Sequence, residues 1–280
     1  MLEVKKENLL VNVFSNINDL VTWCKKTPRR GTAGKSSEDT SDASWYGSKT
    51  LEEAYDKLLH TDDELFQRMK KKSREIKIEK ILGNTYSRNK PFNDVVGFQA
   101  DVPAYLKGVP QNMINVKPLR RSQKIINVCF NISVNCGITK EEVEDAGTIY
   151  ANVIDILEKA GYRCNLYILS ALTYCDETSY CFVKVKTDRE PFNMKKLCYM
   201  FGNVSYNRRI MFKWIESSNM DEEPSQSSYG RPLTDKESIK NVLKKYMKSE
   251  FIVWGIQHGL KAKIEDVIKD LKKTGINLEE

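Results

Sequence analysis

One pattern constrains the fold of this chain more than any other feature. It consists of two apolar segments joined by a helical segment whose start and end are both marked in the sequence. Residues 124–133 (KIINVCFNIS) are almost continuously apolar and β-branched, which is typical of a strand covered on both faces. Thr139 and Glu142 have the spacing of a capping box, and the helical pattern after them ends at Gly161. A second strand, 162–172, follows at once. These short connections predict a right-handed βαβ unit and a parallel α/β core.

The segments after this unit extend the α/β pattern. Residues 178–187 alternate in polarity and predict a third strand, antiparallel to the second. Residues 208–217 fit either a strand or a helix, because their periodicity is consistent with both. The remaining predicted elements are a helix at 193–202, a basic helix at 239–248, a strand at 250–255 and a last helix that contains Ile264, Val267, Ile268 and Leu271. We therefore predict an α/β fold with a Rossmann-like sheet in a core domain at residues 119–280.

Residues 1–118 are predicted to form a mainly helical region that packs on this sheet. A helix with four aligned apolar residues follows a capping Ser15, and two Thr-x-x-Glu capping boxes start at Thr50 and Thr61. Residues 27–44 are built from Gly, Ser, Thr, Asp and basic residues with no apolar period. We interpret this segment as a mobile loop.

Two further segments are rich in turn-forming and polar residues. Residues 217–238 form a second polar loop, and long loops often carry binding residues. Residues 84–118 combine Gly and Pro with scattered apolar residues, which favours an ordered connector over a linker. The apolar side chains of this connector are expected to be buried: Phe98, Tyr105, Leu106 and Met113.

Composition excludes several classes of protein. The 280 residues are 40% hydrophobic, which is enough for a folded core, and no apolar stretch approaches the roughly 20 residues of a membrane-spanning helix. The start of the chain lacks the pattern of a signal peptide, so we expect a cytoplasmic protein. Seven cysteines without a Cys-x-x-Cys pair predict buried thiols, not disulfides or a zinc site. The net charge of +7 permits contact with nucleic acid or with an acidic protein surface.

The turn after the first core strand is the candidate contact site. Asn131, Ser133 and Asn135 alternate there, and Thr139 follows at the helix start. Ligands of open parallel sheets bind beyond the carboxyl ends of the strands, so these small polar side chains are well placed to contact a ligand or partner.

This turn resembles the start of a von Willebrand factor A domain, which carries Asp-x-Ser-x-Ser at the same place. That family holds Mg²⁺ with those side chains, since oxygen atoms are the ligands that this ion prefers. Here Asn131 occupies the aspartate position and Asn135 the final serine position, while Ser133 is retained. Because the anionic ligand is missing, we expect side-chain hydrogen bonds to stabilise the turn and no metal to bind.

A second resemblance extends from Trp45 to Leu169. Its most specific parts are the segments WYGSKT, YLKGVP and LEKAGY. Over this range the chain is similar to a family of uncharacterised proteins encoded by tailed bacteriophages and related mobile elements. The resemblance implies a phage origin, and hence the cytoplasm of an infected bacterial host, but no reaction.

Clusters of basic residues are candidate nucleic-acid contacts. If they share one face, phosphate neutralisation would give salt-sensitive binding that does not depend on base sequence. Solvated helix faces that keep the protein soluble explain the same residues. The candidate residues are Arg29, Arg30, Lys70, Lys71, Lys72, Arg208 and Arg209.

No residue is assigned a catalytic role. The chain has no P-loop, Gly-x-Ser-x-Gly, His-Glu-x-x-His or Gly-x-Gly-x-x-Gly segment, and no cofactor is expected. His258 lies between two glycines and could serve as a general base or as a turn histidine bonded to backbone. His60 at a predicted helix end fits a structural role.

These observations favour a non-enzymatic phage protein that binds another protein inside the infected cell. The binding would serve self-assembly, as a homo-oligomer, or inhibition of a host defence complex. Two alternatives stay open: a nucleic-acid-binding protein of phage replication or packaging, and a structural component of the virion.

Overall fold

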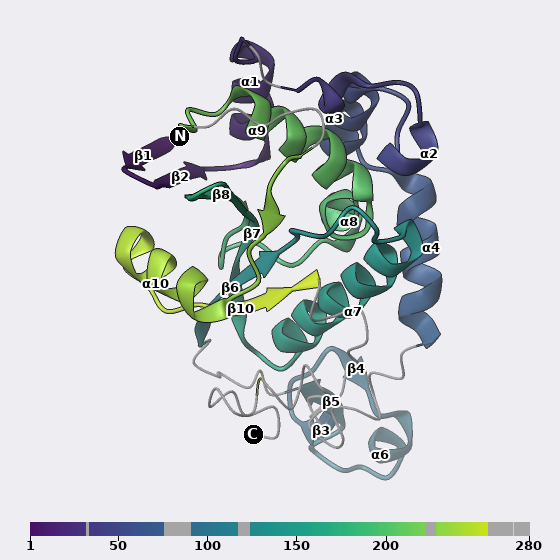
Figure 1. The fold of residues 1–280 in the computed structure, drawn as a ribbon. Coiled ribbons are helices and arrows are strands. Elements are labelled where there is room, and N and C mark those ends of the chain that lie inside the picture. The colour runs from purple at the N-terminus through teal and green to yellow at the C-terminus, as the bar shows by residue number, and fades with distance from the viewer. Residues whose placement is uncertain (32–33, 76–90, 117–123, 222–227, 257–270, 272–280) are drawn as a thin grey trace.

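A mixed β-sheet forms the centre of the structure (Figure 1). The computed structural model describes residues 1–31, 34–75, 91–116, 124–221, 228–256 and 271. Within them, the strands of this sheet are β1 (Leu2–Lys6), β2 (Leu9–Phe14), β6 (Ile125–Asn131), β7 (Arg163–Tyr174), β8 (Glu177–Lys186), β9 (Arg231–Pro232) and β10 (Ile252–Gly255). Their order is β1-β2-β8-β7-β6-β10, and the short β9 pairs with the end of β7. The protein is therefore of mixed α/β class, as predicted.

The predicted βαβ unit is present at the centre of this sheet. Strands β6 and β7 pair in parallel, with Asn131 opposite Leu169, and α7 (Lys140–Lys159) connects them. The capping box of Thr139 and Glu142 starts α7, and Gly161 takes a left-handed conformation just after its end. The antiparallel pairing of β8 with β7 is also confirmed. Strand β10 falls within the predicted segment 250–255 and pairs in parallel with β6.

The region predicted to be mainly helical also contains two strands at its start. Strands β1 and β2 form an antiparallel hairpin that turns at Glu7 and Asn8, and β2 pairs in parallel with β8. The hairpin belongs to the sheet because Leu10 and Phe14 are buried on one of its faces and Val11 on the other. The region 1–118 thus supplies two strands to the sheet that the sequence suggested began near residue 119.

Helices cover both faces of the sheet (Figure 1). Helices α7 and α8 pack on one face with α4 outside them, and α10 lies on the other face. In β6, Val128 and Phe130 enter the larger core, and Cys129 enters the smaller core beneath α10. The further helices are α1 (Ile17–Lys26), α2 (Ala43–Tyr46), α3 (Leu51–His60), α4 (Asp63–Glu75), α8 (Met194–Gly202), α9 (Phe212–Ser217) and α10 (Lys236–Met247).

The starts of α1 and α4 were predicted to within one residue, but the capping residue differs in each case. Asn16, not Ser15, caps α1 by accepting a hydrogen bond from the Asp19 backbone N–H. Asp62, not Thr61, accepts from the Leu65 backbone N–H at the start of α4. The ambiguous segment 208–217 is helical, with a π-helix η3 (Tyr206–Met211) that continues into α9.

The two predicted polar loops are in contact with each other. The described part of 27–44 contains a short 3₁₀ helix, η1 (Ser36–Glu38), and Ser37 is fully buried. The Glu216 carboxylate accepts hydrogen bonds from the Ser37 backbone N–H (2.8 Å) and hydroxyl (2.5 Å). It also accepts one from the Tyr229 hydroxyl (2.6 Å), so residues of both segments meet at one buried carboxylate.

The connector forms a small second sheet at one end of the molecule (Figure 1). It consists of β3 (Pro91–Asp94), β4 (Gln99–Ala100), α6 (Val102–Leu106) and β5 (Met113–Val116), with β5 between the other two strands. The predicted last helix around Ile264 and the turn at His258 lie outside the described residues. In the part of the chain that the structure describes, no helix has the length and apolar character needed to cross a membrane.

The cysteines give a direct test of the core. Cys136 and Cys175 are exposed. Burial raises the pKa of Cys24 and Cys164 to about 12 and that of Cys198 to about 11, and it also raises the pKa of Cys129 and Cys181. We expect iodoacetamide to alkylate Cys136 and Cys175 in the native protein and the five buried thiols only after unfolding. Peptide mass spectrometry would show this, and rapid native labelling of Cys129 or Cys181 would contradict the packing.

The crossing of α7 and α8 gives a second test. A Cβ atom at Gly147 would meet the backbone carbonyl of Phe201 closer than non-bonded atoms can approach. We expect Gly147→Ala to lower the free energy of unfolding by about 2 kcal/mol, because one of the two helices must shift. Denaturant unfolding would measure it. Gly137→Ala is the matched control, since nothing lies within 4 Å of the added atom, and an equal effect of both substitutions would contradict the close approach.

Candidate functional site

The turn after β6 is held by its own polar side chains. The Asn131 side-chain amide donates to the carbonyl of Leu233 (2.7 Å), and its oxygen accepts from the Ser133 backbone N–H (3.0 Å). The Ser133 hydroxyl oxygen accepts from the Ala171 backbone N–H of β7 (2.7 Å). Asn131 and Thr139 are thus engaged in holding the turn and capping α7, as the hydrogen-bonded interpretation of this turn predicts.

A pocket of about 420 Å³ lies beyond the carboxyl end of β6 and beside Ser170, Ala171 and Leu172 of β7. Of the four predicted contact residues, Ser133 and Asn135 line it. Arg231 of β9 and residues of η1, α2, η3 and α9 complete its wall, so segments far apart in sequence meet here. Its position follows the general rule for open parallel sheets, in which ligands bind at the carboxyl ends of strands.

Arg208 is a buried residue that lines this pocket and holds its wall in place. Its side chain is 4% exposed, and its guanidinium group donates to the carbonyls of Trp45 (2.6 Å), Cys136 (3.0 Å) and Ile138 (2.6 Å). The group also lies 4.2 Å from the centre of the Trp45 ring. Arg208 therefore fixes α2 against the turn after β6, with Trp45 between them.

Arg209 makes the same kind of contact on the other side of η3. It is fully buried and donates to the carbonyls of Ser37 (3.1 Å), Ser48 (2.9 Å) and Lys49 (3.1 Å), and also to that of Asp39. Its guanidinium carbon lies 4.0 Å from the centre of the Tyr46 ring. Arg209 thus gathers the carbonyl groups of one N-terminal segment around a single cation.

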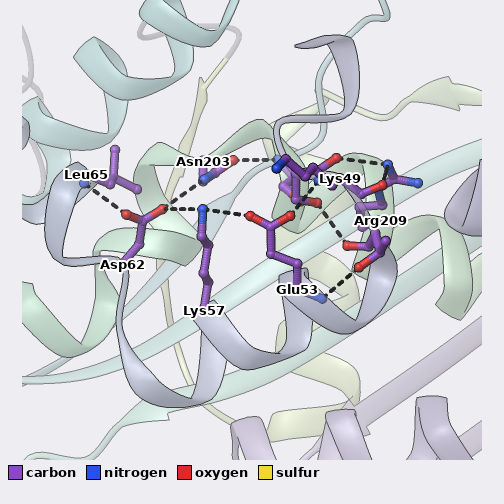
Figure 2. Close-up of polar contacts among 10 residues, drawn as sticks. Lys49, Glu53, Lys57, Asp62, Leu65, Asn203 and Arg209 are labelled. Carbon is purple, nitrogen blue, oxygen red and sulfur yellow. Dashed lines mark hydrogen bonds and ion pairs between the residues drawn. The ribbon is translucent and has the colours of Figure 1, made fainter. Parts of the chain in front are cut away.

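Polar contacts continue from Arg209 along α3 (Figure 2). The Lys49 backbone N–H donates to the Glu53 carboxylate (2.7 Å), and Lys57 lies between Glu53 (3.1 Å) and Asp62 (3.8 Å). Asp62 also accepts from the Asn203 side chain (3.4 Å), which connects the start of α4 to the end of α8. The network fixes the helices that support the pocket wall.

Neither arginine forms an ion pair with a described residue. Burial lowers the pKa of both Arg208 and Arg209, and the charge of each is balanced by carbonyl dipoles inside the protein. Both side chains are buried and their terminal nitrogens are bonded to carbonyls inside the protein, so the structure does not present Arg208 and Arg209 to a nucleic-acid backbone, contrary to the prediction. Two aromatic residues near these arginines in sequence, Tyr206 and Trp214, are also buried in the core.

The other predicted basic contacts divide into paired and exposed residues. Arg29 pairs with Glu38 and Glu216, and Lys72 with Glu144 and Asp145. Arg30 donates to the carbonyls of Ser218 and Met220. Lys70 and Lys71 on α4 are exposed and form no ion pair with a described residue. The structure therefore leaves two of the seven candidate cations open to solvent.

An exposed apolar surface covers the small second sheet and α6. Phe98 is 69% exposed, Tyr105 66% and Leu106 78%. The prediction that these three side chains are buried is wrong, while Met113 is half-buried. We use the name apolar surface for the large hydrophobic residues of segment 91–116 that are exposed: Val95, Val96, Phe98, Val102, Tyr105, Leu106 and Val109.

Sequence reasoning missed this surface because apolar side chains are expected inside a fold unless another observation places them outside. The one available signal was the density of turn residues. Gly97, Pro103, Gly108 and Pro110 divide the segment into elements of two to five residues, too short to enclose a core of their own.

The described residues contain no group of three or more His, Cys, Asp or Glu side chains arranged to hold a metal ion. His60 is exposed at the end of α3, with its Nε2 atom 3.9 Å from the Asp56 carboxylate. His60 does not line the pocket.

Comparison with known proteins places the chain in a family. A family model described as a domain of unknown function, DUF7192, matches residues 3–276. The chain belongs to this family. No curated protein and no solved structure matches it. The DUF7192 match includes the main sheet, the pocket and the apolar surface, so all three are parts of one family domain.

The role of Arg209 can be tested by a conservative substitution. Arg209→Lys keeps the positive charge but cannot reach four carbonyl groups at once. We expect it to lower the free energy of unfolding by about 3 kcal/mol, because buried carbonyls lose their donors. Denaturant unfolding would measure this loss. Lys71→Ala is the control on an exposed cation and should change stability by less than about 0.5 kcal/mol. Equal effects would show that the buried network does not hold the N-terminal segment.

Proposed function

We propose that this protein is a non-enzymatic binding protein that attaches to another protein through the apolar surface. The observation that supports the proposal is the exposure of Phe98, Tyr105 and Leu106 together on one small segment of chain. Single exposed apolar residues are ordinary, whereas several large ones on one short segment favour an interaction site.

The energetics of the second sheet support the same proposal. None of its hydrophobic residues is among the buried residues of the described chain. A sheet of three very short strands needs a covered hydrophobic face for stability, and its own elements do not supply the cover. Burying a large apolar side chain contributes about 1.5–3 kcal/mol, so Phe98, Tyr105 and Leu106 could supply most of the free energy of a stable complex.

Charge favours a partner of different sequence over a second copy. The whole chain carries a net charge of +7, so two copies repel each other at long range. The segment 91–116 itself contains Asp94, Asp101 and Lys107 as its charged residues and adds little to this field. The partner that fits is a protein with an apolar groove and an acidic surrounding surface.

The setting of this binding follows from the sequence resemblance to phage proteins. We propose that it occurs in the cytoplasm of an infected bacterium and that the partner is a host protein such as a component of a defence complex. The nucleic-acid alternative loses support because Arg208 and Arg209 are buried. A virion structural role is retained as an outcome of the test below.

The test uses the full chain carrying a tag, purified from infected cells with and without nuclease. Partners that survive nuclease are identified by mass spectrometry, purified and titrated against three proteins: wild type, Phe98→Ser/Leu106→Ser and the control Leu59→Ser. Leu59 is 39% exposed on α3, so its substitution changes an exposed apolar residue outside the apolar surface. We expect the double variant to bind at least about 100-fold more weakly, since two apolar anchors are lost, and the control to bind like wild type.

Three results would contradict the proposal. The double variant could bind the purified partner as tightly as wild type. The association could disappear with nuclease, which would assign the function to nucleic acid. The full chain could self-associate through these residues, or be recovered in purified particles, which would favour a homo-oligomer or a virion component. Circular dichroism of both variants would establish that they fold.

A further inference from the structure

The pocket beyond the carboxyl end of β6 is lined by two arginines, Arg208 and Arg231. The Arg208 guanidinium is already bonded to the carbonyls of Trp45, Cys136 and Ile138, so Arg208 shapes the wall and leaves Arg231 as the cation available to a ligand. Arg231 lines the same pocket, is exposed and pairs with no described carboxylate. No aspartate or glutamate is among the described lining residues. A negative group placed beside Arg231 would therefore meet a guanidinium charge without an ion-pair partner, and the described lining residues add no carboxylate to repel it.

Free hydrogen-bonding groups lie in the same space. Ser170 is 3% exposed, lines the pocket and has a hydroxyl group without a partner among the described residues. Ser133 uses its hydroxyl oxygen as an acceptor from the Ala171 N–H, so its own proton remains available to a ligand. The Ser170 hydroxyl and the proton of the Ser133 hydroxyl are therefore both available as hydrogen-bond donors to a ligand in the pocket.

Aromatic side chains form another part of the lining. Phe212 and Tyr229 are stacked with ring centres 4.2 Å apart, and the Trp45 ring lies 6.2 Å from that of Phe212. All three line the pocket and are half-buried. Arg208 fixes Trp45 and Glu216 fixes the Tyr229 hydroxyl, so these rings are held in place before any ligand arrives. Such a wall favours a flat apolar group.

We propose that this pocket binds a small organic anion in which a carboxylate or phosphate is attached to a flat ring. The charged group lies at Arg231 and the serine hydroxyls, and the ring lies against Phe212, Tyr229 and Trp45. The volume of about 420 Å³ is in the range of small-molecule sites. This site is separate from the apolar surface, because no residue of segment 91–116 lines it.

The two sources of such an anion can be told apart by titration. Isothermal titration calorimetry of the full chain would use adenosine 5′-monophosphate, indole-3-acetate and inorganic phosphate as probes. A ring-bearing phosphate that binds best identifies a nucleotide-like ligand, and a ring-bearing carboxylate that binds best identifies an aromatic acid. Inorganic phosphate is expected to bind weakest, since it lacks the ring.

Matched variants locate the binding. Arg231→Gln should weaken the better probe about tenfold or more, as expected for one lost charge-assisted hydrogen bond. Arg189→Gln removes an exposed arginine outside the pocket and should leave the affinity unchanged. Phe212→Leu should weaken the ring-bearing probes and leave inorganic phosphate unaffected.

The proposal is overturned if none of the probes binds at millimolar concentration, or if Arg231→Gln and Arg189→Gln have the same affinity as wild type. Thermal unfolding of each variant would exclude loss of the fold as the cause. The Phe98→Ser/Leu106→Ser variant should bind the probes normally, so failure here and failure of the proposed protein binding are distinguishable.

Discussion

Two consecutive buried arginines hold together the parts of this protein that the sheet alone does not connect. Arg208 and Arg209 lie on the π-helix η3, whose wider turn places neighbouring side chains differently from an α-helix. Their guanidinium groups bond to carbonyls of η1, α2 and the turn after β6, which are segments without regular partners for those carbonyls. A buried cation is costly unless such dipoles surround it, so the arginines and these segments depend on one another.

The contacts of these arginines also account for several residue types in the segment WYGSKT, residues 45–50. In WYGSKT, Trp45 receives the Arg208 guanidinium on its ring, and Gly47 has a positive φ at a place where a Cβ would meet the Asn203 side chain. The Ser48 hydroxyl bonds to that of Ser205 (2.7 Å), and Thr50 caps α3. Trp45, Gly47 and Ser48 thus all contact the region around η3, about 160 residues later in the chain, while Thr50 acts locally.

Local patterns predicted the centre of the fold because its elements are specified by neighbouring residues. The capping box at Thr139, the helix end at Gly161 and the apolar strands can all be recognised within a short window. The β1–β2 hairpin and the buried arginines could not be predicted in this way. Their environment is set by partners far away in sequence: β8 for the hairpin, and carbonyls of residues 37–49 for Arg209. The turn after β6 was located correctly, but the aromatic residues that line the pocket with it come from α2, α9 and Tyr229, which no local pattern brings together.

The pocket and the apolar surface differ in how the protein supports them. Trp45, Tyr229 and Ser133 are each fixed by a bond to another element, so the pocket is preorganised and can bind a small ligand with little loss of entropy. Phe98, Tyr105 and Leu106 are largely exposed, and no hydrophobic residue described between 92 and 115 is fully buried. A surface of this kind gains its stability from whatever covers it, which suits a macromolecular partner better than a small molecule. The two proposals thus rest on different physical grounds: a preorganised pocket for the ligand, and exposed apolar side chains for the protein partner.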